Sequence, residues 1–109
     1  DSGGVKLDAN ADAAGDLYIN AATDGAVGGV LTVTASTGNI TQGVALAVTG
    51  ASSFTTSADD ATITLDTTTN AFTGAITLTT NDASGNDAAV TIDGGTTALD
   101  IATSTVEVT

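Results

Sequence analysis

The chain has 109 residues, a formal net charge of −12 at pH 7, and no Cys, His, Met, Trp or Pro. The absence of Cys and His excludes a soft-metal site, a thiol nucleophile and a Ser-His-Asp triad, so we expect no enzymatic activity. Lys6 is the one basic residue against 13 acidic residues, and we expect no nucleic-acid partner because this charge repels phosphate.

Short segments that alternate apolar and polar residues predict β-strands along the whole chain. Each segment has one aliphatic residue on each side of a residue that is mostly small or polar. This is the pattern of a strand with one buried face. In chain order they are 5–7, 17–19, 31–33, 46–48, 63–65, 76–78, 90–92, 99–101 and 106–108. Asn, Asp, Gly, Ser and Thr fill the connections, as in turns. No stretch favours a helix, since Thr, Asp and Asn are weak helix formers.

The first aliphatic residues of the first seven segments, from Val5 to Val90, recur about every 14 to 15 residues, with steps that vary from 12 to 17. We interpret this as an internal repeat in which each repeat is one coil, because a single coil cannot bury its aliphatic pair alone. The pattern therefore predicts an all-β fold, a parallel β-helix (β-solenoid) of about seven coils. Residues 1–109 form one such domain or a repeat segment. An antiparallel β-sandwich is the alternative fold.

Neither end of the sequence has the distinct polar face of a capping repeat. The strand pattern is already present at 5–7 and still present at 106–108. Ends without caps expose strand edges, which favour pairing with another chain. We therefore predict self-association, either of separate copies stacked end to end or of adjacent repeats in a longer chain.

The sequence of residues 31–42, LTVTASTGNITQ, resembles a sequence motif of long bacterial β-strand-repeat surface proteins. These proteins are similar to the filamentous-haemagglutinin and large-adhesin repeat group. The motifs that usually come after it in those proteins are resembled, in the same order, by residues 46–55, 61–65 and 70–78. The resemblance implies a secreted parallel β-helix with surface, adhesive or filament-forming roles, and it carries over no catalytic residues.

These observations predict an extracellular structural protein, a subunit or repeat segment of a cell-surface filament or fibre. One alternative is the stalk or repeat module of a secreted adhesin, with a carbohydrate or host surface as partner. Another is a donor-strand, pilin-like β-sandwich subunit. We expect no membrane insertion, because no run of residues approaches the roughly 18 apolar residues of a membrane helix.

Calcium is the one ligand that the acidic composition favours. Asp8, Asn10, Asp12 and Asp16 alternate with small residues in one loop, so their oxygen atoms can converge on a cation. The usual Gly of a calcium loop is replaced by Ala13, and Ile19 stands where a bidentate Glu is common. Asp82 and Asp87 belong to a second polar loop that we also consider as a calcium site. Bound cations would relieve repulsion among the carboxylates.

Outward-facing threonines suggest a third function class, ice or surface binding. Thr32 and Thr34, and likewise Thr77 and Thr79, form Thr-x-Thr pairs. We expect Asp66 and Asp93 to interrupt the array, which argues against this function.

Overall fold

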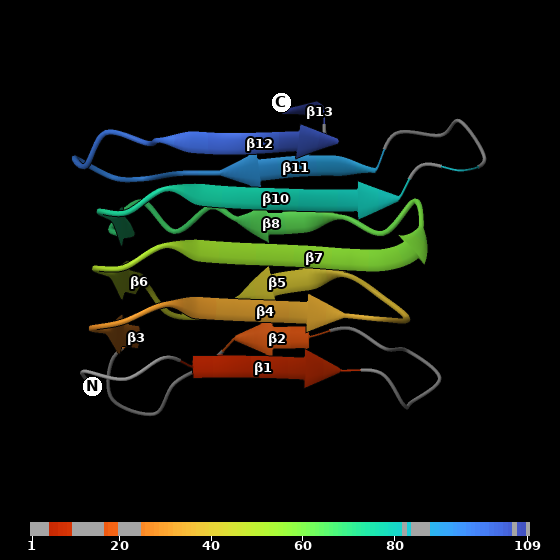
Figure 1. Ribbon diagram of the computed structural model, residues 1–109, viewed down its shortest axis with the longest axis horizontal. Helices are drawn as coiled ribbons and strands as arrows, with labels where there is room; N and C mark the ends of the chain where they lie inside the picture. The colour runs from red at the N-terminus through yellow and green to blue at the C-terminus, as the bar shows by residue number, and fades with distance from the viewer. Residues whose placement is uncertain are drawn as a thin grey trace.

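The computed structural model describes residues 5–9, 17–19, 25–81, 83, 88–105 and 107–108 (Figure 1). All regular secondary structure in these ranges is β-strand, which confirms the prediction of an all-β fold. The strands are β1 (Val5–Ala9), β2 (Leu17–Ile19), β3 (Gly25–Val27), β4 (Leu31–Ala35), β5 (Ile40–Gln42), β6 (Leu46–Val48), β7 (Ser52–Asp59), β8 (Ile63–Leu65), β9 (Ala71–Phe72), β10 (Ile76–Asn81), β11 (Ala89–Ile92), β12 (Ile101–Thr105) and β13 (Glu107–Val108). Within the described residues, no helix is long and apolar enough to cross a membrane.

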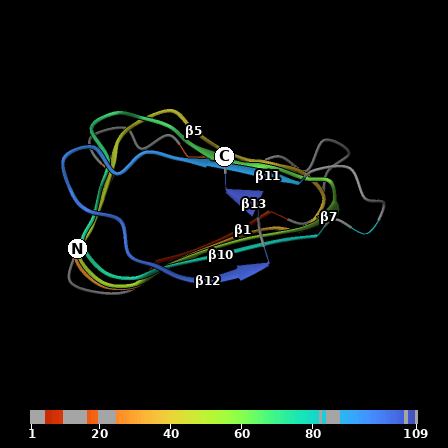
Figure 2. The same ribbon diagram turned by 90° about the horizontal axis from the view of Figure 1, so that it is seen from above.

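The strands form three parallel sheets that the chain visits in turn. The first sheet has the order β1-β4-β7-β10-β12, the second β13-β11-β8-β5-β2, and the third β3-β6-β9. Every strand pair described is parallel, so the chain rises by one strand in each sheet as it winds. Figure 2 shows successive coils superimposed when the molecule is viewed from above. The fold is therefore solenoid-like, and the β-sandwich alternative is wrong for these residues because a sandwich is antiparallel.

Residues that stack in the first sheet are 21 to 26 positions apart in the chain. Val5 pairs with Leu31, Leu31 with Ser52, and Ser52 with Ile76. The predicted period of 14 to 15 residues does not match these distances, and the predicted total of about seven coils is not confirmed. The reason is that the predicted segments come from all three sheets. The spacing of 15 residues from Leu31 to Leu46, for example, joins β4 of the first sheet to β6 of the third.

Apolar side chains fill the space between the sheets. Along β4 buried and half-buried residues alternate, with Leu31, Val33 and Ala35 on the inside. The rings of Phe54 in β7 and Phe72 in β9 meet edge to face, with centroids 6.1 Å apart and planes at 85°. This geometry is a favoured one for aromatic pairs. Stacked coils thus share one continuous core, as expected of a solenoid.

A column of glycines lets the coils approach closely where the chain passes from the third sheet to the first. The Gly50 N–H donates to the Gly29 carbonyl over 3.2 Å. A Cβ atom on Gly50 would lie 2.5 Å from the Gly29 oxygen, and one on Gly74 would lie equally close to the Gly50 carbonyl. No side chain fits at either position, because real Cβ atoms do not approach a carbonyl so closely. Glycine is therefore required at this corner.

Candidate functional site

The predicted calcium ligands lie almost entirely outside the described residues. The backbone of Asp8 belongs to β1 and pairs with Thr34. Its side chain lies outside the described residues, as do Asn10, Asp12 and Asp16 of the first loop and both Asp82 and Asp87 of the second. Within the described part of the chain, no three acidic residues are grouped so as to hold a metal ion. Calcium binding therefore stays a prediction.

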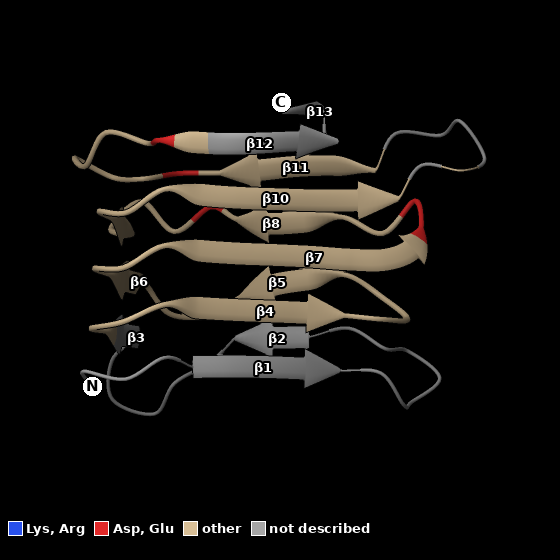
Figure 3. Cartoon of the chain, in the orientation of Figure 1, with Lys and Arg blue, Asp and Glu red and all other residues tan. Residues whose placement is uncertain are grey.

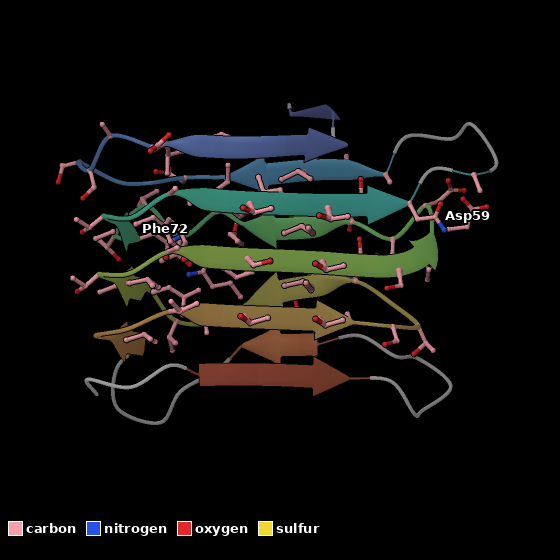
Figure 4. The ribbon with its side chains drawn as sticks, in the orientation of Figure 1. Asp59 and Phe72 are labelled. Carbon is pink, nitrogen blue, oxygen red and sulfur yellow. The ribbon has the colours of Figure 1, made fainter. Side chains whose placement is uncertain are left out.

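The acidic side chains that the structure describes lie at strand ends and corners (Figure 3). They are Asp59, Asp60, Asp66, Asp93 and Asp100. The Asp59 carboxylate accepts a hydrogen bond from the Ala83 N–H over 2.6 Å, beyond the end of β10 (Figure 4). The next residue, Asp60, has a left-handed φ of 62° and donates its N–H to the Asn81 carbonyl. Asp59 and Asp60 therefore help to close a corner between two coils.

The outer surface of the first sheet carries two columns of hydroxyl side chains over β4, β7 and β10 (Figure 4). We call this surface the hydroxyl face. The pairing of the strands aligns Thr32, Ser53 and Thr77 in one column. It aligns Thr34, Thr55 and Thr79 in the other. All six residues are half-buried, while the residues between them on each strand are buried.

The two columns continue in the backbone pairing at both ends of the sheet. On the β12 side Thr103 and Thr105 pair with Thr77 and Thr79. On the β1 side Lys6 and Asp8 occupy the corresponding positions. The backbone pairing thus sets two threonines of β12 beside the columns, after a register shift between Ile76 and Thr77.

Asp66 and Asp93 do not interrupt this array, so that expectation is wrong. Asp66 follows β8 and Asp93 follows β11, and both strands belong to the second sheet. In the second sheet, β8 and β11 each have a single hydroxyl residue, Thr64 and the paired Thr91. The Thr-x-Thr arrangement is therefore confined to the first sheet among the strands described.

A buried polar network, which the sequence did not predict, lies inside the corner between the second and third sheets. Asn70 is 2% exposed. Its amide NH₂ donates to Gln42 Oε1 and to the carbonyls of Leu65 and Asp93, over 3.1, 3.2 and 3.1 Å. Its Oδ1 accepts from the Leu46 N–H over 2.8 Å and from the Gln42 amide. One side chain thereby joins three successive coils.

The chain belongs to a family described as "Repeats of unknown function (DUF5649)", which matches residues 2–79. This match shows that the protein is a repeat protein, in agreement with the stacked coils. No curated protein and no solved structure shows significant similarity to it.

Proposed function

We propose that the chain is an extracellular structural protein, a subunit or repeat segment of a cell-surface filament assembled by end-to-end stacking of β-strands. The proposal includes strand edges that remain open to pairing at the ends of the stack. Its support is a series of hydrogen bonds that repeats from coil to coil. A coil joined by the same bonds at either end would extend the stack without a new kind of contact.

The series runs in the stacking direction of the first sheet. At each step, the N–H of the first residue of a strand donates to the carbonyl of the residue just before the next strand. The bonds are Leu31 to Ala51, Ser52 to Ala75 and Ile76 to Asp100, at 3.0, 2.9 and 2.8 Å. Ile101 takes the next position, since it pairs with Ile76. By this pattern its N–H is directed away from β10, toward the site of a further coil.

Apolar residues at this edge favour the same partner. Leu99 and Ile101 are 36% and 37% exposed, whereas Ile76, one coil below, is fully buried. A further coil on β12 would cover Ile101 as β12 covers Ile76. Burial of apolar area stabilises such a contact by about 25 cal/mol per Å². The further coil belongs to another copy in a filament, or to the same chain in an adhesin stalk.

The test is electron microscopy of the purified chain by negative stain over a range of concentrations. The molecule measures 37 × 27 × 21 Å, and its strands stack along the 27 Å axis (Figure 1). We expect filaments with a cross-section near 37 × 21 Å that lengthen with concentration. Monomers at every concentration would contradict self-assembly and favour the adhesin module.

A variant separates strand pairing from simple apolar adhesion. Ile101→Pro removes the N–H that would donate to the next coil, and proline is tolerated at the first residue of a strand. Ile101→Ala keeps this N–H and removes most of the side chain. We expect Ile101→Pro to abolish filaments and Ile101→Ala to shorten them, both with cooperative melting. Filaments of unchanged length from Ile101→Pro would refute the strand-pairing model.

A further inference from the structure

We propose that the hydroxyl face binds ice, with the ordered water of the crystal surface as its ligand. This inference is independent of filament assembly, because the face is perpendicular to the strand edges that would pair. Three properties of the face carry it: its regular spacing, its lack of charge, and its unused hydroxyl groups.

The spacing follows from parallel strands in register. Neighbouring strands of a sheet are about 4.8 Å apart, and residues i and i+2 on one strand are about 6.6 Å apart. Thr34, Thr55 and Thr79 therefore repeat at the first distance, and Thr32 and Thr34 are separated by the second. The hydroxyl groups therefore form a regular two-dimensional array, which suits a ligand that is itself periodic, such as the surface of an ice crystal. The strands lie nearly parallel in Figure 1, so the columns stay aligned across the sheet.

The charge distribution selects a neutral ligand. The chain carries a formal charge of −12, yet β4 and β10 contain no charged residue. Lys6 and Asp8 take the paired positions on β1, so the uncharged surface is confined to β4, β7 and β10. On β7 the one charged residue is Asp59, at the far end of the strand from Ser53 and Thr55. Ice is uncharged, whereas a bound cation would require carboxylates and a phosphate would require basic groups. A sugar ring is disfavoured because no aromatic residue lies on the outer surface of these three strands.

The hydroxyl groups are free to bond to water. None of the six hydroxyls of the face hydrogen-bonds to another residue that the structure describes. A hydroxyl donates one hydrogen bond and accepts two, so it can take the place of a lattice water. The threonine methyl groups beside them order the adjacent water. Because the sheet fixes all of these groups in advance, little conformational entropy is lost when they bind together.

The experiment measures thermal hysteresis and ice-crystal shape in a nanolitre osmometer with the full chain. Thr55→Lys places a long charged side chain at the centre of the hydroxyl face. Thr64→Lys is the matched control, because Thr64 is also a half-buried threonine at the middle of a strand, on the second sheet. We expect faceted crystals and a hysteresis gap from the wild type, loss of both in Thr55→Lys, and full retention in Thr64→Lys.

Two results would overturn the proposal: round, unshaped crystals without hysteresis from the wild-type chain, or equal loss in both variants. Circular dichroism melting checks that each variant is folded. If Thr55→Lys does not fold, Thr79→Lys repeats the test one strand further along the same column. Filament formation is scored separately, so failure of ice binding leaves the proposed structural function unaffected.

Discussion

The side-chain amides of Asn70 and Gln42, which lie in two neighbouring coils of the solenoid, form hydrogen bonds to each other. Asn70 donates to Gln42 Oε1 over 3.1 Å, and the Gln42 amide donates in return to Asn70 Oδ1. The two residues are 28 positions apart in the chain. Gln42 Oε1 also accepts from the Thr67 N–H over 3.4 Å. Since Asn70 bonds in addition to backbone groups of its own and both neighbouring coils, the pair fixes the stacking at this corner.

We expect Asn70→Ala to lower the free energy of unfolding by about 3 kcal/mol. The substitution leaves the buried Leu46 N–H without its acceptor and removes a donor to the Asp93 carbonyl, and each such loss costs about 1–3 kcal/mol. Urea unfolding followed by circular dichroism gives the value. Gln42→Ala is the control, with an expected loss of about 1 kcal/mol, because Asn70 keeps its backbone partners. A larger loss for Gln42→Ala than for Asn70→Ala would contradict this assignment.

Sequence reasoning predicted the strands better than their stacking. The segments 17–19, 46–48 and 63–65 are β2, β6 and β8 with the predicted bounds. By contrast, four strands are absent from the predicted segments because each lacks a pair of large aliphatic residues: β3, β5, β7 and β9. The period was misjudged for a physical reason: every sheet faces the same core, so the period-two pattern carries no information about which sheet a strand joins.

The same limit affects the candidate sites. Thr32, Thr34, Thr77 and Thr79 were recognised as Thr-x-Thr pairs, but their place in one array depends on a register that no local pattern gives. Asn70 gave no signal, because its side-chain partner Gln42 lies 28 residues away and is brought close only by stacking. A coil length of 21 to 26 residues aligns the threonine pairs, whereas Asn70 and Gln42 are separated by more than one such length and meet only through the shape of the corner.

Gly50 and Gly74 test the close approach of the coils. We expect Gly50→Ala and Gly74→Ala each to lower the free energy of unfolding by about 2 kcal/mol, the usual cost of forcing atoms into a filled space. The added Cβ would meet the rigid carbonyl of the glycine one coil below, which cannot rotate away. Thermal melting measures the change.

Gly43→Ala is the matched control for these glycines. Gly43 is exposed and has no positive φ, so alanine there should be neutral or stabilise the fold by about 0.4–1 kcal/mol. Equal melting temperatures for Gly43→Ala and Gly50→Ala would show that the glycine column is not tightly packed.

Ser52 places a hydroxyl in an otherwise aliphatic column. It is 2% exposed and stacks between Leu31 and Ile76, and its Oγ has no hydrogen-bond partner among the described residues. We expect Ser52→Ala to raise the free energy of unfolding by about 1 kcal/mol, since it removes an unsatisfied buried group. Ser53→Ala, on the half-buried outer position next to it, should change stability by less than about 0.5 kcal/mol. Destabilisation by Ser52→Ala would indicate a buried partner, such as a water molecule.

The dependence of the melting temperature on NaCl and on Ca²⁺ distinguishes screening of the repelling carboxylates from binding of calcium at a specific site. With a net charge of −12, the chain should melt at a higher temperature as NaCl is added, because salt screens like charges. If Asp8, Asn10, Asp12 and Asp16 bind Ca²⁺, calcium should raise the melting temperature further at the same ionic strength. At a calcium concentration one hundred times the Kd, binding adds about 2.7 kcal/mol to the free energy of unfolding. This corresponds to a rise in melting temperature of roughly ten degrees or more.

Substitutions assign that increment to the predicted loop. The double variant Asp12→Asn with Asp16→Asn should lose the calcium-specific increment and keep the response to NaCl. Asp66→Asn is the control, since it removes an exposed carboxylate that lies outside the loop. Differential scanning calorimetry at matched ionic strength reads all three proteins. Equal effects of CaCl₂ and NaCl on the melting temperature of the wild type would refute a specific calcium site. At matched ionic strength, screening alone raises the melting temperature equally with either salt.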